Sequence, residues 1–168
     1  PDAALLLDFG AATVETVPLG FDEAGLAVLV VDSTVRHAHA DGEYGVRRRE
    51  CEEAAALLGV PLLADVPVAG LEQALASLPE ALRRRARHIV TDTARCRVAA
   101  DAVRDDRPRD LGPILTEAHA SMRDDFEASD PAVDAAVEAA IAAGALGARI
   151  TGGGFGGSCI ALVDVDRA

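Results

Sequence analysis

Residues 151–158 read Thr151-Gly152-Gly153-Gly154-Phe155-Gly156-Gly157-Ser158, and this stretch decides how the chain of 168 residues is interpreted. Short apolar runs flank it at Ala148–Thr151 and Ser158–Val163, and both are typical of strands. Glycine tolerates positive φ angles and lets another group approach the backbone closely, at a cost of about 0.5–1 kcal/mol relative to alanine. We therefore expect a loop whose backbone packs against a phosphate or against another loop.

The glycine-rich stretch also contains the spacing G-x-G-x-x-G at Gly152, Gly154 and Gly157. A dinucleotide-binding loop needs a following helix and an acidic residue about 20 positions further on, whereas a strand-like run follows here. A tight hairpin needs only one or two glycines, so we favour a packed backbone surface over a simple turn. Successive backbone N–H groups in such a turn form a concave anion site, which keeps phosphate among the expected contacts.

Composition excludes several classes of function. The chain carries 28 acidic and 16 basic residues, a net charge of −12, so we expect no basic face for nucleic acid. Every basic residue is an arginine, whereas the Walker A phosphate loop requires a lysine. No apolar run approaches the roughly 20 residues that span a bilayer, and three widely spaced cysteines make no disulfide framework. We therefore expect a cytoplasmic protein without nucleic-acid or membrane partners.

The order of secondary-structure signals predicts an α+β fold. Strands are expected at Ala4–Phe9, Thr13–Pro18 and Leu26–Val31, and the continuous apolar run of the last is typical of a strand buried on both faces. Helical spacing of apolar residues predicts four helices over residues 44–58, 78–103, 111–126 and 131–141. Strands at both ends with helices between them predict a mostly antiparallel sheet with helices packed on one face.

Capping signals predict where two of these helices begin. Ser77 and Glu80 have the spacing of a capping box at the start of the long helix. Asp130 followed by Pro131 is typical of an N-cap with a proline in the first turn, and Gly144 is placed to end that helix.

Four potential metal ligands stand at alternating positions, namely His37, His39, Asp41 and Glu43. On a strand all four would share one face, whereas on a loop that enters a helix Asp41 would be the N-cap. Zinc sites need three or four convergent ligands, and no second ligand cluster accompanies these residues, so we expect no metal site in this chain.

Other charged and titratable residues have ordinary structural interpretations. The triplet Arg47–Arg49, followed by acidic residues, predicts a solvated helical face with i,i+4 ion pairs. His88 and His119 fall on expected helices and are interpreted as surface or packing residues.

Three stretches resemble the galactokinases of the GHMP small-molecule kinase superfamily. Residues 31–52 are similar to the galactokinase segment whose core reads RHSLA-x-x-EY-x-x-RR-x-x-CE. Residues 115–129 are similar to the helix that reads M-x-x-SH-x-SLRDDYEVS, and residues 151–158 resemble the third GHMP motif. The first two stretches are specific to galactokinases, and together with the connecting elements the three cover nearly the whole chain in the expected order.

The resemblance implies a single GHMP kinase C-terminal domain over residues 1–168, in which residues 1–20 border an N-terminal domain that is missing here. It implies ATP-dependent phosphorylation of galactose at O1, with Mg²⁺. In the family the tyrosine of the EY pair contacts the sugar, and that residue here is Tyr44. The residues that would border the cleft and support the phosphate-binding loop are Gly152, Gly153, Gly154, Phe155, Gly156 and Gly157.

The family's sugar-binding first motif, its serine-rich second motif and its catalytic aspartate do not occur in these 168 residues. Phosphoryl transfer depends on positioning and electrostatic stabilisation by those groups. We therefore expect no catalytic and no metal-binding residue in this chain, ATP and Mg²⁺ bound mainly by the missing domain, and no galactokinase activity from this piece alone. We also expect the uncovered surface to self-associate through the glycine-loop face or the first strands.

Departures from the family pattern keep alternatives open. Ala38-His39 replaces the usual Ser-Leu, and Phe126 replaces a tyrosine, so the preferred sugar is not fixed by the resemblance. A kinase for another sugar, a non-catalytic GHMP-type ligand sensor and a stand-alone binding module are the alternatives. An intact first motif, second motif and catalytic aspartate upstream would support an enzyme, whereas a degraded second motif would support the sensor.

Overall fold

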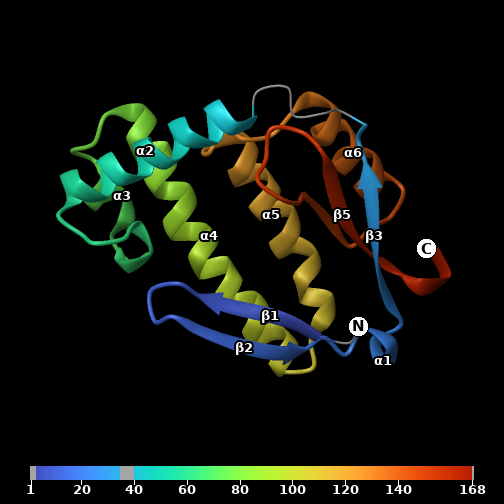
Figure 1. Ribbon diagram of the computed structural model, residues 1–168. Helices are drawn as coiled ribbons and strands as arrows, with labels where there is room; N and C mark the ends of the chain where they lie inside the picture. The colour runs from blue at the N-terminus through green and yellow to red at the C-terminus, as the bar shows by residue number, and fades with distance from the viewer. Residues whose placement is uncertain (1–2, 35–39, 168) are drawn as a thin grey trace.

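The computed structural model describes residues 3–34 and 40–167, which contain two separate antiparallel sheets (Figure 1). One sheet is a hairpin of β1 (Ala3–Asp8) and β2 (Thr13–Pro18). In the other, β5 (Ser158–Asp164) lies between β3 (Leu26–Asp32) and β4 (Gly147–Ile150). The expected strands are therefore present, although they divide between two sheets.

Helices fill the sequence between β3 and β4, as expected. In chain order the α-helices of the described residues are α1 (Phe21–Ala24), α2 (Ala40–Leu58), α3 (Leu71–Leu75), α4 (Glu80–Arg104), α5 (Leu111–Asp124) and α6 (Pro131–Ala142). Single 3₁₀ turns occur at Leu63–Asp65, Pro108–Asp110 and Val165–Arg167. The arrangement confirms the α+β class, and the short helices α1 and α3 are additions that the sequence pattern did not predict.

Buried side chains form two hydrophobic clusters. The first joins α2, α3 and the first half of α4, with Ala54 and Leu75 fully enclosed. The second joins the three-stranded sheet to α5 and α6, where Val133 and Val137 of α6 meet Ile150 of β4. The helices α5 and α6 therefore share one core with the sheet, and this core lies directly beneath the glycine-rich connection from β4 to β5.

The prediction for β3 was correct in extent and wrong in burial. Within the described residues β3 pairs only with β5, so it is an edge strand. Val28 and Val30 are 45% and 70% exposed, whereas a strand buried on both faces would enclose them. The continuous apolar run thus marks a surface that is left open in this chain.

The capping signals had mixed outcomes. Asp130 is the N-cap of α6, and its carboxylate accepts a hydrogen bond from the Ala132 amide at 2.8 Å. Gly144 adopts a φ of 100° just after α6, and its amide donates to the Ile141 carbonyl at 2.9 Å, which confirms its predicted role.

The capping box predicted at Ser77 was wrong. The N-cap of α4 is Pro79, and no side chain caps the helix there. The Arg83 guanidinium instead donates to the carbonyls of Ala76 and Leu78, each at 3.1 Å, so it secures the turn that a serine cap was expected to hold.

Candidate functional site

The glycine loop, residues Gly152–Gly157, connects β4 to β5, which are neighbouring antiparallel strands. It is therefore a hairpin connection after all, although a wide one, closed by the Thr151 amide donating to the Ser158 carbonyl at 3.0 Å. Positive φ angles occur at Gly152, Gly154, Phe155, Gly156 and Gly157, with Phe155 at 64°. Glycine adopts these angles without strain, which accounts for glycine at four of the five positions, whereas Phe155 must be held at its angle by its surroundings.

The backbone of the glycine loop packs against another loop, which was one of the two contacts expected. The Phe155 amide donates to the Ala128 carbonyl at 2.7 Å. A Cβ added at Gly154 would lie 2.4 Å from that same carbonyl oxygen, so only glycine fits there. On the other side, the amide and the hydroxyl of Ser33 both donate to the Gly157 carbonyl, at 2.9 and 2.5 Å.

The hydrogen bonds of the loop's own amides differ between the glycines and Phe155. Within the described part of the chain, the glycine amides of the loop have no hydrogen-bond acceptor, whereas the Phe155 amide has one. Consecutive backbone N–H groups in a turn can form an anion-binding surface. Phosphate contact at this loop stays a prediction.

The exit segment, residues Asp125–Ala128 just after α5, carries the loop's support. The Arg85 Nη1 donates to the Asp125 carbonyl at 2.6 Å. The Arg47 Nε donates to the Phe126 carbonyl at 2.7 Å, and its Nη2 donates to the Glu127 carbonyl at 3.1 Å. Two arginines therefore bind three successive carbonyls, and the glycine loop binds the fourth.

The prediction of a solvated arginine face holds for Arg48 and is wrong for Arg47. Arg48 forms an i,i+4 pair with Glu52 at 2.8 Å, and both side chains are more than half exposed. Arg47 is only 16% exposed, and its guanidinium lies over the Phe155 ring with its central carbon 5.9 Å from the ring centroid. Residues one apart on a helix point in different directions, so one arginine of the triplet turns inward.

Arg85 is a buried charge that the sequence gave no reason to single out. Its side chain is 3% exposed and binds Glu50 at 2.8 Å and the carboxylate of Glu127. Burial alone would lower the pKa of Arg85, but hydrogen bonds to the two carboxylates outweigh it and raise the pKa above its usual value. The same hydrogen bond from Arg85 holds the pKa of Glu127 below its usual range, so both groups stay charged at neutral pH.

His88 and His119 are both buried, which confirms the packing interpretation and excludes the surface one. His88 stacks on Phe126 with ring centroids 4.5 Å apart, and its Nδ1 lies 3.0 Å from the Ser121 hydroxyl. Burial lowers the pKa of His88 to about 4, so the ring is neutral at pH 7.

His119 ties the end of β4 to α5. Its Nδ1 accepts the Ile150 amide at 3.3 Å, and its Nε2 lies 3.3 Å from the Asp134 carboxylate of α6. An acceptor Nδ1 requires the proton on Nε2, and burial lowers the pKa of this ring as well. Neither histidine is therefore placed as a charged acid. His88 packs against the exit segment, and His119 holds the end of β4.

Tyr44 lies in the first turns of α2 and is 56% exposed, so it is not part of the apolar seam of that helix. The N-terminal end of α2 lies beside the connection from β4 to β5 (Figure 1). The guanidinium of Arg47 on this part of α2 lies over the ring of Phe155 in the glycine loop. The structure thus brings the two predicted parts of the site, Tyr44 and the loop, to one side of the molecule.

The potential metal cluster is only partly covered by the structure. His37 and His39 lie outside the described residues. Among the residues that are described, no group of three or more His, Cys, Asp or Glu side chains converges as a metal site. Cys51 is not a candidate nucleophile, since burial raises the pKa of its thiol to about 11. Within the same residues, no helix has the length and apolar character needed to cross a membrane.

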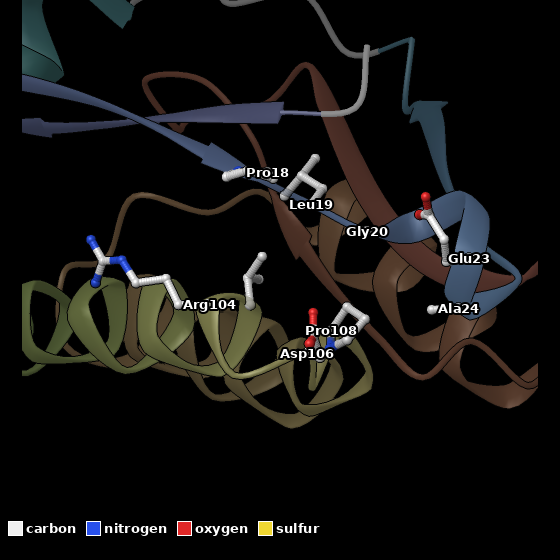
Figure 2. Close-up of a pocket in the computed structure, with 9 residues that line it drawn as sticks. Pro18, Leu19, Gly20, Glu23, Ala24, Arg104, Asp106 and Pro108 are labelled. Atoms are coloured by element: carbon white, nitrogen blue, oxygen red, sulfur yellow. The ribbon is translucent and has the colours of Figure 1, made fainter.

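A separate pocket of about 720 Å³ lies between the end of β2, α1 and the C-terminal end of α4 (Figure 2). Its lining includes neither Tyr44 nor any residue of the glycine loop. Arg104, which borders it, is held by Glu15 and Asp101, each at 2.7 Å. This arginine is already neutralised, so we assign the pocket no role in the candidate site.

Comparison with known proteins identifies the relatives of this chain. Residues 99–168 match the family described as GHMP kinases C terminal. The galactokinase of Streptomyces coelicolor is 48% identical over 163 residues, which are 96% of this chain and 42% of that protein. The galactokinase of Homo sapiens is 44% identical over 166 residues, which are 98% of this chain and 42% of that protein.

Among solved structures, the crystal structure of Lactococcus lactis galactokinase complexed with galactose superposes with a TM-score of 0.91. Its sequence is 30% identical, and the match covers 98% of this chain and 44% of that one. The chain therefore spans less than half the length of these relatives. The similarity confirms the fold that the three sequence motifs implied.

Proposed function

We propose that this chain, which has the fold of the GHMP kinase C-terminal domain and is related to galactokinases along its length, forms the C-terminal part of a galactokinase. In the complete protein it would serve the ATP-dependent phosphorylation of galactose at O1, giving galactose 1-phosphate. The observation that carries this proposal is the adjacency of two separate motifs. The end of α2 that bears Tyr44 borders the glycine loop, and Arg47 of the same helix lies over the ring of Phe155.

In this proposal Tyr44 contacts the sugar and the glycine loop borders the phosphates. A half-exposed tyrosine can form a hydrogen bond to a sugar through its hydroxyl, and its ring can pack against the apolar face of the sugar. The loop presents backbone N–H groups that no described residue occupies, which suits a neighbouring phosphate or phosphate-binding loop. The chain's own contribution is therefore binding and positioning.

The proposal assigns ATP and Mg²⁺ mainly to the rest of the protein. Mg²⁺ is usually held by carboxylates together with substrate phosphates. Among the described residues no such cluster of acidic side chains converges, so they do not fit an ion by themselves. The free thiols of Cys51, Cys96 and Cys159 suit a reducing compartment, and we propose the cytoplasm.

The proposed function is tested by assaying galactose phosphorylation with the complete protein and with residues 1–168 alone. We expect activity from the complete protein and none from this piece, because positioning of the phosphates and activation of the sugar hydroxyl need the missing residues. In the complete protein Tyr44→Ala should raise the KM for galactose by about tenfold, the effect of losing one good hydrogen bond. Galactose-dependent ATP hydrolysis by the pure piece would contradict the assignment.

The open apolar surface supports a proposal about the isolated chain. Leu5 and Leu7 stand two residues apart on β1, and Leu7 pairs with Val14 of β2, so the three share one face of the hairpin. They are 64%, 48% and 68% exposed, and Phe9 at the hairpin tip is 87% exposed. Contiguous apolar patches on monomers are uncommon and mark interaction sites.

We expect residues 1–168 alone to self-associate through this face. Light scattering should show an apparent mass that rises with protein concentration. Replacing Leu5 and Leu7 by serine should reduce the rise, because the apolar area that drives association is removed. A constant monomer mass over a wide concentration range would contradict the expectation.

A further inference from the structure

The Arg47 side chain reaches from α2 to both the exit segment and the glycine loop. Its guanidinium binds the carbonyls of Phe126 and Glu127, and its central carbon lies over the ring of Phe155, 5.9 Å from the centroid. The exit segment in turn holds the loop, since the Ala128 carbonyl accepts the Phe155 amide. Arg47 therefore acts on the loop by two routes, one direct and one through the backbone of the next residues.

The geometry of this contact requires an arginine. Two nitrogens of one rigid fork reach two successive carbonyls at 2.7 and 3.1 Å, and a third faces Glu50 at 3.2 Å. A lysine ammonium carries the same charge but has no rigid fork that spans the two carbonyls while its charge lies over the ring. The site is only 16% exposed, so water does not readily replace the missing donors.

The position of Arg47 on α2 links the glycine loop to Tyr44. Tyr44 precedes it by three residues, and residues three apart lie on the same side of a helix. The loop that Arg47 anchors and the tyrosine that would contact the sugar are therefore held by one helical turn. Phe155, with a φ of 64°, sits in a backbone conformation that surrounding contacts must maintain.

We propose that Arg47 is a positioning residue that fixes the glycine loop relative to the end of α2 that carries Tyr44. The proposal rests on the proposed function only for the roles given to Tyr44 and the loop, whereas the mechanical link is independent of it. Arg48 provides the matched control, because it has the same charge on the same helix and its ion pair with Glu52 is solvent-exposed.

The test compares Arg47→Met, Arg47→Lys and Arg48→Met in the complete protein. Amide hydrogen exchange is followed for a peptide covering residues 151–158 and for peptides from α4. We expect Arg47→Met to speed exchange in the loop by about tenfold, the effect of losing charge-assisted hydrogen bonds, with α4 unchanged. Arg47→Lys should be intermediate, and Arg48→Met should match the unsubstituted protein. Since Arg47→Lys keeps the positive charge beside Glu50, it decides the question if Arg47→Met fails to fold.

Steady-state kinetics give a readout that general destabilisation would not produce. We expect kcat to fall by about tenfold in Arg47→Met with little change in the KM for galactose, since a displaced loop affects the transition state more than sugar binding. Equal acceleration of exchange in the loop and in α4, or an Arg47→Met variant no different from Arg48→Met, would overturn the proposal. If the unsubstituted protein does not phosphorylate galactose, the proposed function fails, and the exchange experiment still decides the role of Arg47.

Discussion

Replacing Gly147 by alanine is expected to lower the free energy of unfolding by about 3 kcal/mol, the upper end of the usual cost of overpacking. Gly147 is the buried first residue of β4, where it meets Gly112 at the start of α5. A Cβ added at Gly147 would lie 1.8 Å from the Gly112 carbonyl oxygen and 2.8 Å from its Cα. Both obstacles are backbone atoms, so no rotamer change can relieve the clash.

A side chain at Gly112 would also clash with the start of β4, so the same contact can be tested from both sides. A Cβ added at Gly112 would lie 2.4 Å from the Leu146 carbonyl oxygen, so Gly112→Ala should also force α5 away from β4. Because both substitutions disturb one contact, the double variant should cost less than the sum of the two single variants. Urea denaturation of the purified protein measures all three.

Gly42→Ala is the control for the Gly147 prediction. Gly42 lies in α2, and an added Cβ would meet nothing within 4 Å. Alanine in a helix is favoured over glycine by about 0.5–1 kcal/mol, so this variant should be slightly stabilised. A Gly147→Ala midpoint equal to that of Gly42→Ala would show that α5 and β4 are not packed as closely as described.

Local signals in the sequence predicted the elements and their boundaries well where one residue decides the backbone. Asp130 and Gly144 begin and end α6 as predicted, because an N-cap carboxylate and a glycine at positive φ act on their own few neighbours. The strand at β3 was likewise found from its apolar run. The burial of β3 was mispredicted, because an apolar run does not reveal whether other parts of the same chain cover both faces of the strand.

Long-range contacts account for what the sequence did not reveal about the candidate site. Arg85 stands in the run Arg83–Arg85, which is typical of a solvated helix, yet its partners Glu50 and Glu127 are 35 and 42 residues away. The sequence gives no reason to treat Arg47 and Arg48 differently. Arg47 supports the loop because the exit segment passes beside it, whereas Arg48 pairs with Glu52. The glycines predicted that another group approaches the loop's backbone closely, and only the structure identifies that group as the Ala128 carbonyl.

Gly154→Ala is expected to reduce kcat/KM of the complete protein by about 100-fold, the size of effect that follows when a positioning element moves by roughly 1 Å. The φ of Gly154 is 87°, which alanine adopts only with strain. The new Cβ would also lie 2.4 Å from the Ala128 carbonyl oxygen. Since that oxygen accepts the Phe155 amide, the loop cannot keep this hydrogen bond and accommodate the methyl group together.

Gly153→Ala separates this effect from a general intolerance of side chains in the loop. Gly153 is the immediate neighbour, its φ is not positive, and a Cβ there would meet no atom within 4 Å. Its activity should therefore stay within about threefold of the unsubstituted protein, as expected when no contact or backbone angle changes. Equal losses in the two variants would mean that the loop needs bare backbone for a ligand at every position. A loss confined to Gly154→Ala would mean that the backbone angle of this residue and its contact with Ala128 together set the position of the loop.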